Sequence, residues 1–157
     1  MLRYVVFWVL CLGAVSLKAQ EEVVKKVVYD LTTGDIRQFK AHLLGGIVAH
    51  KTYYQGQLAE LEVRVVVHGQ AYRFFMQDLN ATPYVCDQVL VRDKEAIGKR
   101  LKTLATQYNV RFLICRVGAK HRKLPQKAFY PFVGFVENAA IGLIDAQNAG
   151  YAYLPLK

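Results

Sequence analysis

The sequence predicts a three-layer α/β/α sandwich around a mainly parallel sheet of about five strands. Short apolar runs rich in valine and isoleucine alternate along the chain with longer segments in which apolar residues recur every three or four positions. The chain has 157 residues, 54% of them hydrophobic and 21% charged, which suits one folded domain with a substantial core. Strands and helices that alternate in this way form a parallel sheet covered by helices.

The first strand and the first helix follow from two apolar patterns. Residues 23–31 (VVKKVVYDL) form an apolar run whose second half is expected to be buried on both faces of the sheet. After a turn at residues 32–35, a helix is expected to end near Gly56, although Gly45 and Gly46 weaken its intrinsic propensity. The apolar face of this helix consists of Ile36, Phe39, Leu43, Ile47 and Tyr54.

The middle of the chain adds one strand and two helices. Residues 61–68 (LEVRVVVH) form the second predicted strand, and residues 72–79 form a short helix. Residues 86–91 are open to two interpretations, a short strand or an ordered loop. Asp93 is the predicted N-cap of a helix that reaches residue 108.

The last third of the chain completes the sheet. Residues 110–116 (VRFLICR) are expected to form its central strand. The remaining elements are, in order, one short helix within residues 117–131, a strand over residues 132–136, a helix over residues 138–149 and a strand over residues 151–156. Pro155 restricts the final strand to an edge of the sheet or to a strand end, because proline has no N–H to donate.

The amino terminus has the layout of a secretory signal peptide. One early positive charge precedes an apolar run over residues 4–17, which is too short to span a bilayer comfortably, so an uncleaved anchor is the weaker alternative. We predict a signal peptide over residues 1–20 that is cleaved near Ala19 or Gln20, followed by a domain over residues 23–157. The protein is then periplasmic or secreted, with no stable membrane insertion after cleavage.

The chain is basic, with a formal net charge of +9. Such a surface attracts anions of several classes. Nucleic acid is disfavoured because the predicted protein is exported and no combined aromatic and basic RNA-binding motif is present. Small anions or an acidic protein surface are the expected partners, and solubility alone is the plainer explanation of the charge.

Several candidate functional residues follow the predicted strands. Ligands of a parallel sheet bind beyond the carboxyl ends of its strands. Cys115 and His68 lie at two such ends, where cationic neighbours favour a thiolate and a histidine can move its proton, so we predict both as catalytic residues. The predicted anion-binding residues are Arg116, Lys120, Arg122 and Lys123.

Each candidate has a structural alternative. Cys115 can be a small buried hydrophobe, His68 a structural hydrogen-bond donor, and the basic segment a solvated surface. Two cysteines, Cys86 and Cys115, remain after signal cleavage, and they form either a disulfide or two free thiols.

Several other classes of site are disfavoured by missing motifs. No Cys/His spacing indicates a zinc site, so we expect no metal. The sequence contains no GxGxxG or GxxxxGK[ST] phosphate loop and no GxSxG motif. We therefore expect no cofactor, and a nucleotide-dependent enzyme or an α/β hydrolase is disfavoured.

Four motifs together resemble the DsrE/DsrF-like family of small sulfur-metabolism proteins. They are VVYDLTTGD after the first strand, VVVHG at the end of the second, VRFLIC ending in Cys115, and the carboxyl-terminal QNAGYAYLPL. The resemblance implies a five-stranded α/β/α domain that assembles into homo-oligomers, trimers or hexamers. It also implies that Cys115 carries sulfur as a persulfide and passes it between a donor and an acceptor protein.

Two functions remain open, and with them the question of whether the protein is an enzyme. In the first, Cys115 carries sulfane sulfur taken from an anionic donor. In the second, the protein is a non-catalytic oligomeric module that binds a small anion or a partner protein, with Cys115 structural or paired with Cys86.

Overall fold

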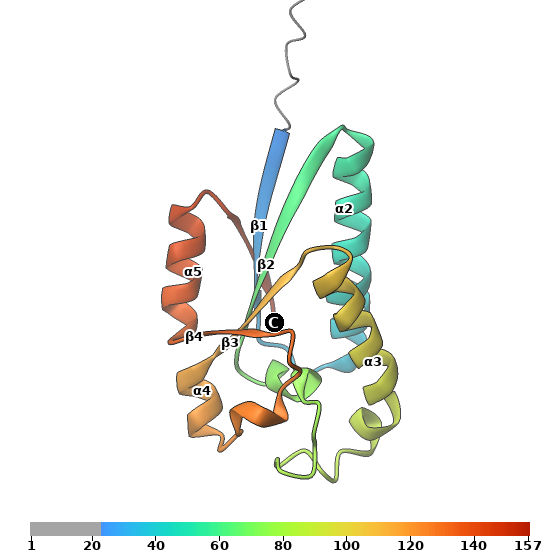
Figure 1. Cartoon of the computed structure of the whole chain (residues 1–157), viewed down its shortest axis with the longest axis vertical. Helices are drawn as coiled ribbons and strands as arrows, with labels where there is room; N and C mark the ends of the chain where they lie inside the picture. The colour runs from blue at the N-terminus through green and yellow to red at the C-terminus, as the bar shows by residue number, and fades with distance from the viewer. Residues whose placement is uncertain (1–22) are drawn as a thin grey trace, which may run out of the picture.

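The computed structural model describes residues 23–157, and over them it has the predicted α/β/α architecture (Figure 1). Within this part of the chain, five strands form one sheet in the order β4-β3-β2-β1-β5, and every neighbouring pair is parallel. The strands are β1 (Val23–Leu31), β2 (Ala59–Val67), β3 (Arg111–Cys115), β4 (Gly134–Val136) and β5 (Ala152–Leu156). The parallel arrangement places their carboxyl ends along one rim of the sheet.

Helices cover both faces of the sheet, as Figure 1 shows. The helix α5 (Ala139–Asn148) lies on one face, and α2 (Gly46–Gly56) and α3 (Gln88–Thr106) lie on the other. Burial follows from this covering, because the last four residues of β1 and the last three of β2 are buried. The predicted burial of the second half of β1 is confirmed.

The predicted helix after β1 forms as three continuous segments. They are α1 (Ile36–Gln38), a π-helical segment η1 (Phe39–Gly45) and α2. The Asp35 carboxylate caps the start, because it accepts hydrogen bonds from the backbone N–H groups of Arg37 and Gln38 at 2.7 and 3.0 Å. The π-helical segment ends at the Gly45–Gly46 pair, where the intrinsic helix propensity is lowest.

Two predictions for the middle of the chain are wrong. The helix α3 begins at Gln88 rather than at Asp93, because Asp87 is its N-cap and accepts a 3.1 Å hydrogen bond from Leu90 N–H. Residues 86–91 therefore contain a turn and the start of a helix, and they form no strand. The predicted helix over residues 72–79 is a shorter 3-10 helix, η2 (Ala71–Phe75).

The position of the strand that ends at Cys115 also differs from the prediction. It is β3, which lies between β2 and the short edge strand β4, so β2 is the central strand. Two short helices, α4 (Arg116–His121) and η3 (Gln126–Ala128), occupy the segment in which one was expected. The strand with Pro155 is an edge strand, as predicted.

The core is dominated by aromatic side chains beneath η1, η2 and β3. Phe39 stacks on Phe74 with ring centroids 4.2 Å apart, and Phe75 contacts both Phe39 and Phe112. All four rings are buried. Truncating one such ring to alanine typically costs about 3–5 kcal/mol, so this cluster anchors η2, and with it the rim of the sheet.

The predicted signal peptide over residues 1–20 lies outside the described residues. Among residues 23–157, no helix has both the length and the apolar character that a membrane crossing requires.

Candidate functional site

The rim at the carboxyl ends of the strands brings the two predicted catalytic residues into neighbouring positions. Cys115 is the last residue of β3, and His68 directly follows β2. The parallel register of β2 and β3 ends at the pair Val67 and Ile114, and His68 and Cys115 are the residues that directly follow this pair. Residues at the same register position of adjacent strands share one face of a sheet. The predicted pair is thus a feature of strand order and register.

The environment of Cys115 is enclosed. Its exposed fraction is 5%, and the Tyr72 hydroxyl donates a 3.0 Å hydrogen bond to its backbone carbonyl oxygen. Burial raises the pKa of Tyr72, and the adjacent Cys115 side chain raises it further. A Cβ on Gly118, in α4, would collide with the Tyr72 hydroxyl. This hydroxyl therefore packs directly against the backbone of α4, the helix that begins after Cys115.

A buried carboxylate holds His68. The Nε2 atom of His68 lies 2.6 Å from Oδ1 of Asp30, and the Tyr153 hydroxyl donates a 2.6 Å hydrogen bond to Oδ2 of the same side chain. Asp30 is only 7% exposed although it lies near the rim end of β1. This hydrogen bond raises the pKa of Tyr153, and partial desolvation adds to the rise, so the hydroxyl stays a protonated donor near neutral pH.

Neither Asp30 nor Tyr153 was predicted from the sequence as a partner of His68. Tyr153 belongs to β5, which is paired only with β1, and its partner Asp30 lies 123 positions away in the chain. The available signal was the alternating pattern YAYLPL beside the first strand of a parallel sheet, which places alternate side chains of both strands on one face.

The predicted anion-binding residues separate into two pairs. Arg116 and Lys120 line a hollow of about 810 Å³ next to α4, whereas Arg122 and Lys123 do not. The Arg116 guanidinium lies 4.8 Å from the ring centroid of Phe135 and donates a 3.1 Å hydrogen bond to Gln126. Further lining residues are Val117, Ala119, His121, Leu124, Phe129 and Glu137.

This hollow has a lining of mixed charge and polarity, and the Cys115 thiol is not part of it. Two cations and a histidine lie beside apolar and aromatic side chains, and one carboxylate, Glu137, is also present. Such a lining suits a small anion with an apolar body. Cys115 is not among the lining residues, although Arg116 follows it directly in the chain. The structure thus separates the predicted anion site from the predicted sulfur site.

Both cysteines of the described chain are free thiols. Cys86 lies exposed in the turn before α3, and Cys115 is buried at the end of β3. The predicted alternative of a Cys86–Cys115 disulfide is therefore not formed in residues 23–157.

Residues 23–157 contain no cluster of three or more His, Cys, Asp or Glu side chains that could hold a metal ion.

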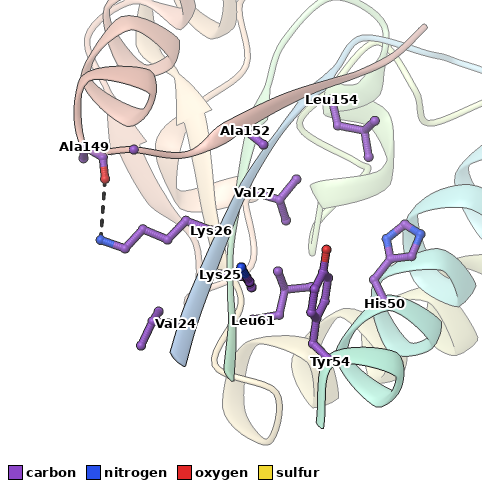
Figure 2. Close-up of a pocket in the computed structure, with 11 residues that line it drawn as sticks. Val24, Lys25, Lys26, Val27, His50, Tyr54, Leu61, Ala149, Ala152 and Leu154 are labelled. Atoms are coloured by element: carbon purple, nitrogen blue, oxygen red, sulfur yellow. Dashed lines mark hydrogen bonds between the residues drawn. The ribbon is translucent and has the colours of Figure 1, made fainter. Parts of the chain in front are cut away.

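A second hollow lies toward the opposite, amino-terminal end of β1 (Figure 2). Its volume is about 580 Å³, and its wall includes His50 and Tyr54 from α2 and Leu154 from the edge strand β5. Lys26 points away to donate a 3.5 Å hydrogen bond to the carbonyl oxygen of Ala149. None of the predicted site residues lines this hollow.

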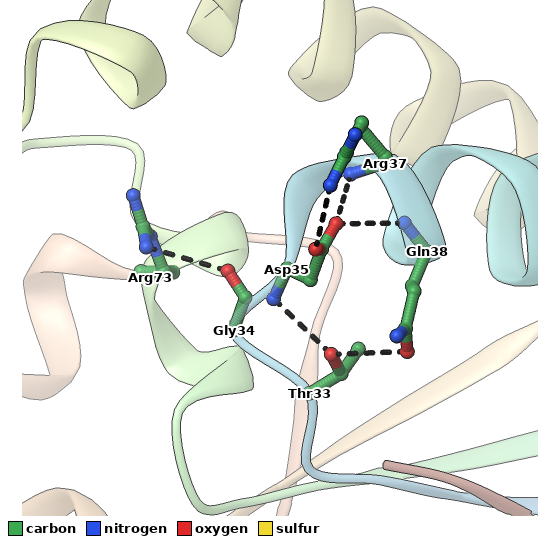
Figure 3. Close-up of polar contacts among 6 residues, drawn as sticks. All are labelled: Thr33, Gly34, Asp35, Arg37, Gln38 and Arg73. Carbon is green, nitrogen blue, oxygen red and sulfur yellow. Dashed lines mark hydrogen bonds and ion pairs between the residues drawn. The ribbon is translucent and has the colours of Figure 1, made fainter.

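The turn between β1 and α1 is fixed by its own polar contacts (Figure 3). The Thr33 hydroxyl accepts a hydrogen bond from Asp35 N–H at 3.1 Å, and Arg73 donates to the Gly34 carbonyl at 3.3 Å. Arg73 also pairs with Asp87, the N-cap of α3. Asp35 and Arg73 therefore hold the rim in shape, and their charged groups are already engaged.

Comparison with known proteins gives a consistent result. The DsrE/DsrF-like family matches residues 26–156. An uncharacterized protein of Aquifex aeolicus (strain VF5) is 29% identical over 131 residues, which is 83% of this chain and 55% of that protein, so the chain spans about half the length of this relative. The solved structure of a protein of unknown function from Methanobacterium thermoautotrophicum has a similar fold. Its TM-score is 0.59 at 17% identity, with 83% of this chain and 98% of that chain covered.

Proposed function

We propose that the chain, which belongs to the DsrE/DsrF-like family, carries sulfane sulfur as a persulfide on Cys115. Family membership alone points to a role related to sulfur relay. The finer proposal, that Cys115 is the carrier and a persulfide the intermediate, is supported by the residues at the carboxyl ends of β2 and β3.

The register at the rim is the observation that supports this proposal most. His68, whose side chain is able to accept a proton, and Cys115 directly follow the last paired residues of β2 and β3, and Cys115 is the only cysteine at a strand end in the described residues. A thiolate is the reactive form of cysteine, so a neighbouring base is the feature that this chemistry requires. Cys86 lies in an exposed turn outside the sheet.

The proposed transfer conserves atoms and electrons. The Cys115 thiolate attacks the outer sulfur of a donor persulfide, a new S–S bond forms on Cys115, and the S–S bond of the donor breaks. The donor leaves as a thiolate, and no external oxidant is consumed. Handing the sulfur to an acceptor thiolate is the same step in reverse. Burial of Cys115 shelters the bound sulfur from water between the two steps.

Mass spectrometry of the purified protein tests this assignment. After exposure to inorganic polysulfide, peptides that contain Cys115 are expected to gain the mass of one or more sulfur atoms. The matched variants are Cys115→Ala and Cys86→Ala. Only Cys115→Ala is expected to lose the added sulfur mass on the peptide that contains position 115. Equal uptake by wild type and Cys115→Ala would rule the carrier out.

A binding module is the second candidate, and the hollow beside α4 favours it. Arg116 and Lys120 supply positive charge there, and Phe129 and Phe135 supply an apolar wall. An anion with an aromatic body would meet both. In this case Cys115 is a structural residue of β3, and the ligand is bound without chemical change.

The fluorescent aromatic sulfonate 8-anilino-1-naphthalenesulfonate is a suitable probe of the hollow. Arg116→Gln is expected to weaken its binding, because the guanidinium beside Phe135 is removed. Arg37→Gln is the matched control, since Arg37 is an exposed arginine of α1 outside the hollow. Equal affinity of the two variants would argue against a ligand site at Arg116.

Export and self-association complete the proposed function. An apolar surface supports a homo-oligomer, because Ile141 and Ile144 on α5 are 49% and 54% exposed, one turn apart. Light scattering on the wild type and on Ile141→Lys/Ile144→Lys tests the assembly, and a monomeric wild type would refute it.

Amino-terminal sequencing of the native protein tests the proposed export, because cleavage near Ala19 or Gln20 would leave a new amino terminus there.

A further inference from the structure

We propose that Asp30 and Tyr153 are positioning residues that hold His68 as the proton acceptor for the Cys115 thiol. This inference rests on the proposed sulfur-carrying function and assigns the proton transfer that precedes it. Its basis is the hydrogen-bonded cluster of Asp30, His68 and Tyr153, which joins the rim ends of β1 and β2 to the first half of β5.

The Asp30 carboxylate determines which nitrogen of His68 carries the proton. An ionised carboxylate can only accept hydrogen bonds, so the Nε2 atom that lies 2.6 Å from Asp30 must be the N–H donor. The neutral ring then has an unprotonated Nδ1, which is the atom able to accept a proton. Because β2 lies between β1 and β3, His68 has Asp30 on one neighbouring strand and Cys115 on the other.

Tyr153 completes the coordination of the carboxylate. Its hydroxyl donates to Oδ2, while His68 donates to Oδ1, so each carboxylate oxygen of this nearly buried side chain has a partner. A buried charge is tolerated only when it is hydrogen-bonded in this way. Tyr153 thus completes the hydrogen bonding of Asp30 and holds the carboxylate in place, from an edge strand that is otherwise mostly exposed.

The proposed proton transfer conserves charge and needs only Cys115, His68 and Asp30. The S–H bond of Cys115 breaks, its proton moves to Nδ1 of His68, and the resulting imidazolium keeps its Nε2–H bond to the Asp30 carboxylate. The negative carboxylate stabilises this positive ring. The thiolate left on Cys115 is then the nucleophile of the sulfur transfer, and the proton returns when the sulfur leaves.

A second histidine of the chain provides an internal comparison. The Tyr29 hydroxyl lies 2.7 Å from Nδ1 of His50, and burial raises the pKa of Tyr29 to about 12, so this phenol is a neutral partner. No carboxylate is hydrogen-bonded to His50 in the described residues, and His50 lies on α2 away from the rim. His50 therefore has a comparable ring hydrogen bond, but to a neutral hydroxyl rather than to a carboxylate.

The experiment uses the full chain with the exposed Cys86 replaced by alanine, so that only the rim cysteine reports. Nitrogen-15 NMR of His68 is expected to show the Nε2–H tautomer in this parent protein. Persulfide formation at Cys115 is expected to fall by about tenfold or more in Asp30→Asn, because a positioned base commonly contributes at least that much. Tyr153→Phe is expected to cause a smaller loss, and His50→Asn none.

The outcomes separate this inference from the proposed function. If Asp30→Asn folds and forms persulfide as fast as His50→Asn, the positioning role is wrong, while loss of sulfur in Cys115→Ala still upholds the carrier. If Asp30→Asn does not fold, Tyr153→Phe and the tautomer of the parent decide. An Nδ1–H tautomer in the parent, or an unchanged rate in Tyr153→Phe, would overturn the assignment.

Discussion

Cys86 and Cys115 are the two thiols of the described chain, and their surroundings differ in almost every respect. Cys86 is exposed in a turn, next to the N-cap of α3. Cys115 is 5% exposed, ends an interior strand next to the strand that His68 follows, and accepts a hydrogen bond from Tyr72 at its carbonyl. Cys86 is therefore accessible to reagents in solution, whereas Cys115 is enclosed. In the proposed sulfur carrier, the enclosure of Cys115 would restrict which donors reach its thiol, whereas the exposed Cys86 has no such restriction.

The largest expected difference between the two thiols is in alkylation. In the native protein, iodoacetamide is expected to modify Cys86 at least about a hundredfold faster than Cys115, because a buried thiol reacts only after a local opening. In denaturant the two rates should converge. Peptide mass spectrometry against time measures both rates, and similar native rates would show that Cys115 is not enclosed.

Packing around Tyr72 provides the next test. Gly118→Ala places a methyl group against the Tyr72 hydroxyl and is expected to reduce the free energy of unfolding by about 1–3 kcal/mol. Alkylation of Cys115 should accelerate in parallel, while that of Cys86 should not. Gly56→Ala is the matched control, because nothing lies within 4 Å of its added methyl group. Urea unfolding that ranks the two variants equally would disprove the tight contact at α4.

Removing the Tyr72 hydroxyl should have a smaller effect. Tyr72→Phe leaves the carbonyl of Cys115 without its donor and is expected to cost about 1–2 kcal/mol in urea unfolding. The aromatic ring remains, so the fold should be retained. A variant as stable as the wild type, with unchanged Cys115 alkylation, would mean that this hydrogen bond does not hold the end of β3.

The smallest expected effect is a pH dependence at the turn after β1. Hydrogen bonds from the backbone N–H groups of Gln38 and Arg37 lower the pKa of Asp35 in the folded state. Its contribution to stability is therefore complete above the ordinary aspartate pKa of about 3.9, and it is lost as the pH falls through the lower folded pKa. Asp35→Asn should flatten this acid limb of the melting temperature, and Asp145→Asn on the exposed face of α5 should not.

The sheet was predictable because its signals are local. Apolar runs and turn residues define the strands, and parallel strands necessarily place His68 and Cys115 at the same rim. The order of strands is a tertiary property that local patterns do not determine. For this reason the expectation that β3 is the central strand was wrong. Asp87 and Asp93 are both N-cap residue types, and Asp93 instead pairs with Lys40 at 2.7 Å, a contact that spans 53 positions.

The site was predictable only in its residue types. That His68 partners Asp30, and that Tyr153 joins them, depends on side chains 38 and 123 positions apart. The basic segment gave no indication that Arg116 would lie over Phe135 while Arg122 and Lys123 would stay outside the hollow. The end of β3 at Cys115 likewise depends on η2, through the hydrogen bond from the Tyr72 hydroxyl, which lies 43 positions away.

Cyanide-labile sulfur is the most direct measure of the claim that Cys115 carries sulfur for transfer. Cyanide removes the outer sulfur of a persulfide as thiocyanate and leaves the thiol, so thiocyanate counts transferable sulfur. After loading with polysulfide and removal of the excess, Cys86→Ala is expected to release about one thiocyanate per chain, and Cys86→Ala/Cys115→Ala essentially none. Equal release from the two proteins would contradict a carrier role for Cys115.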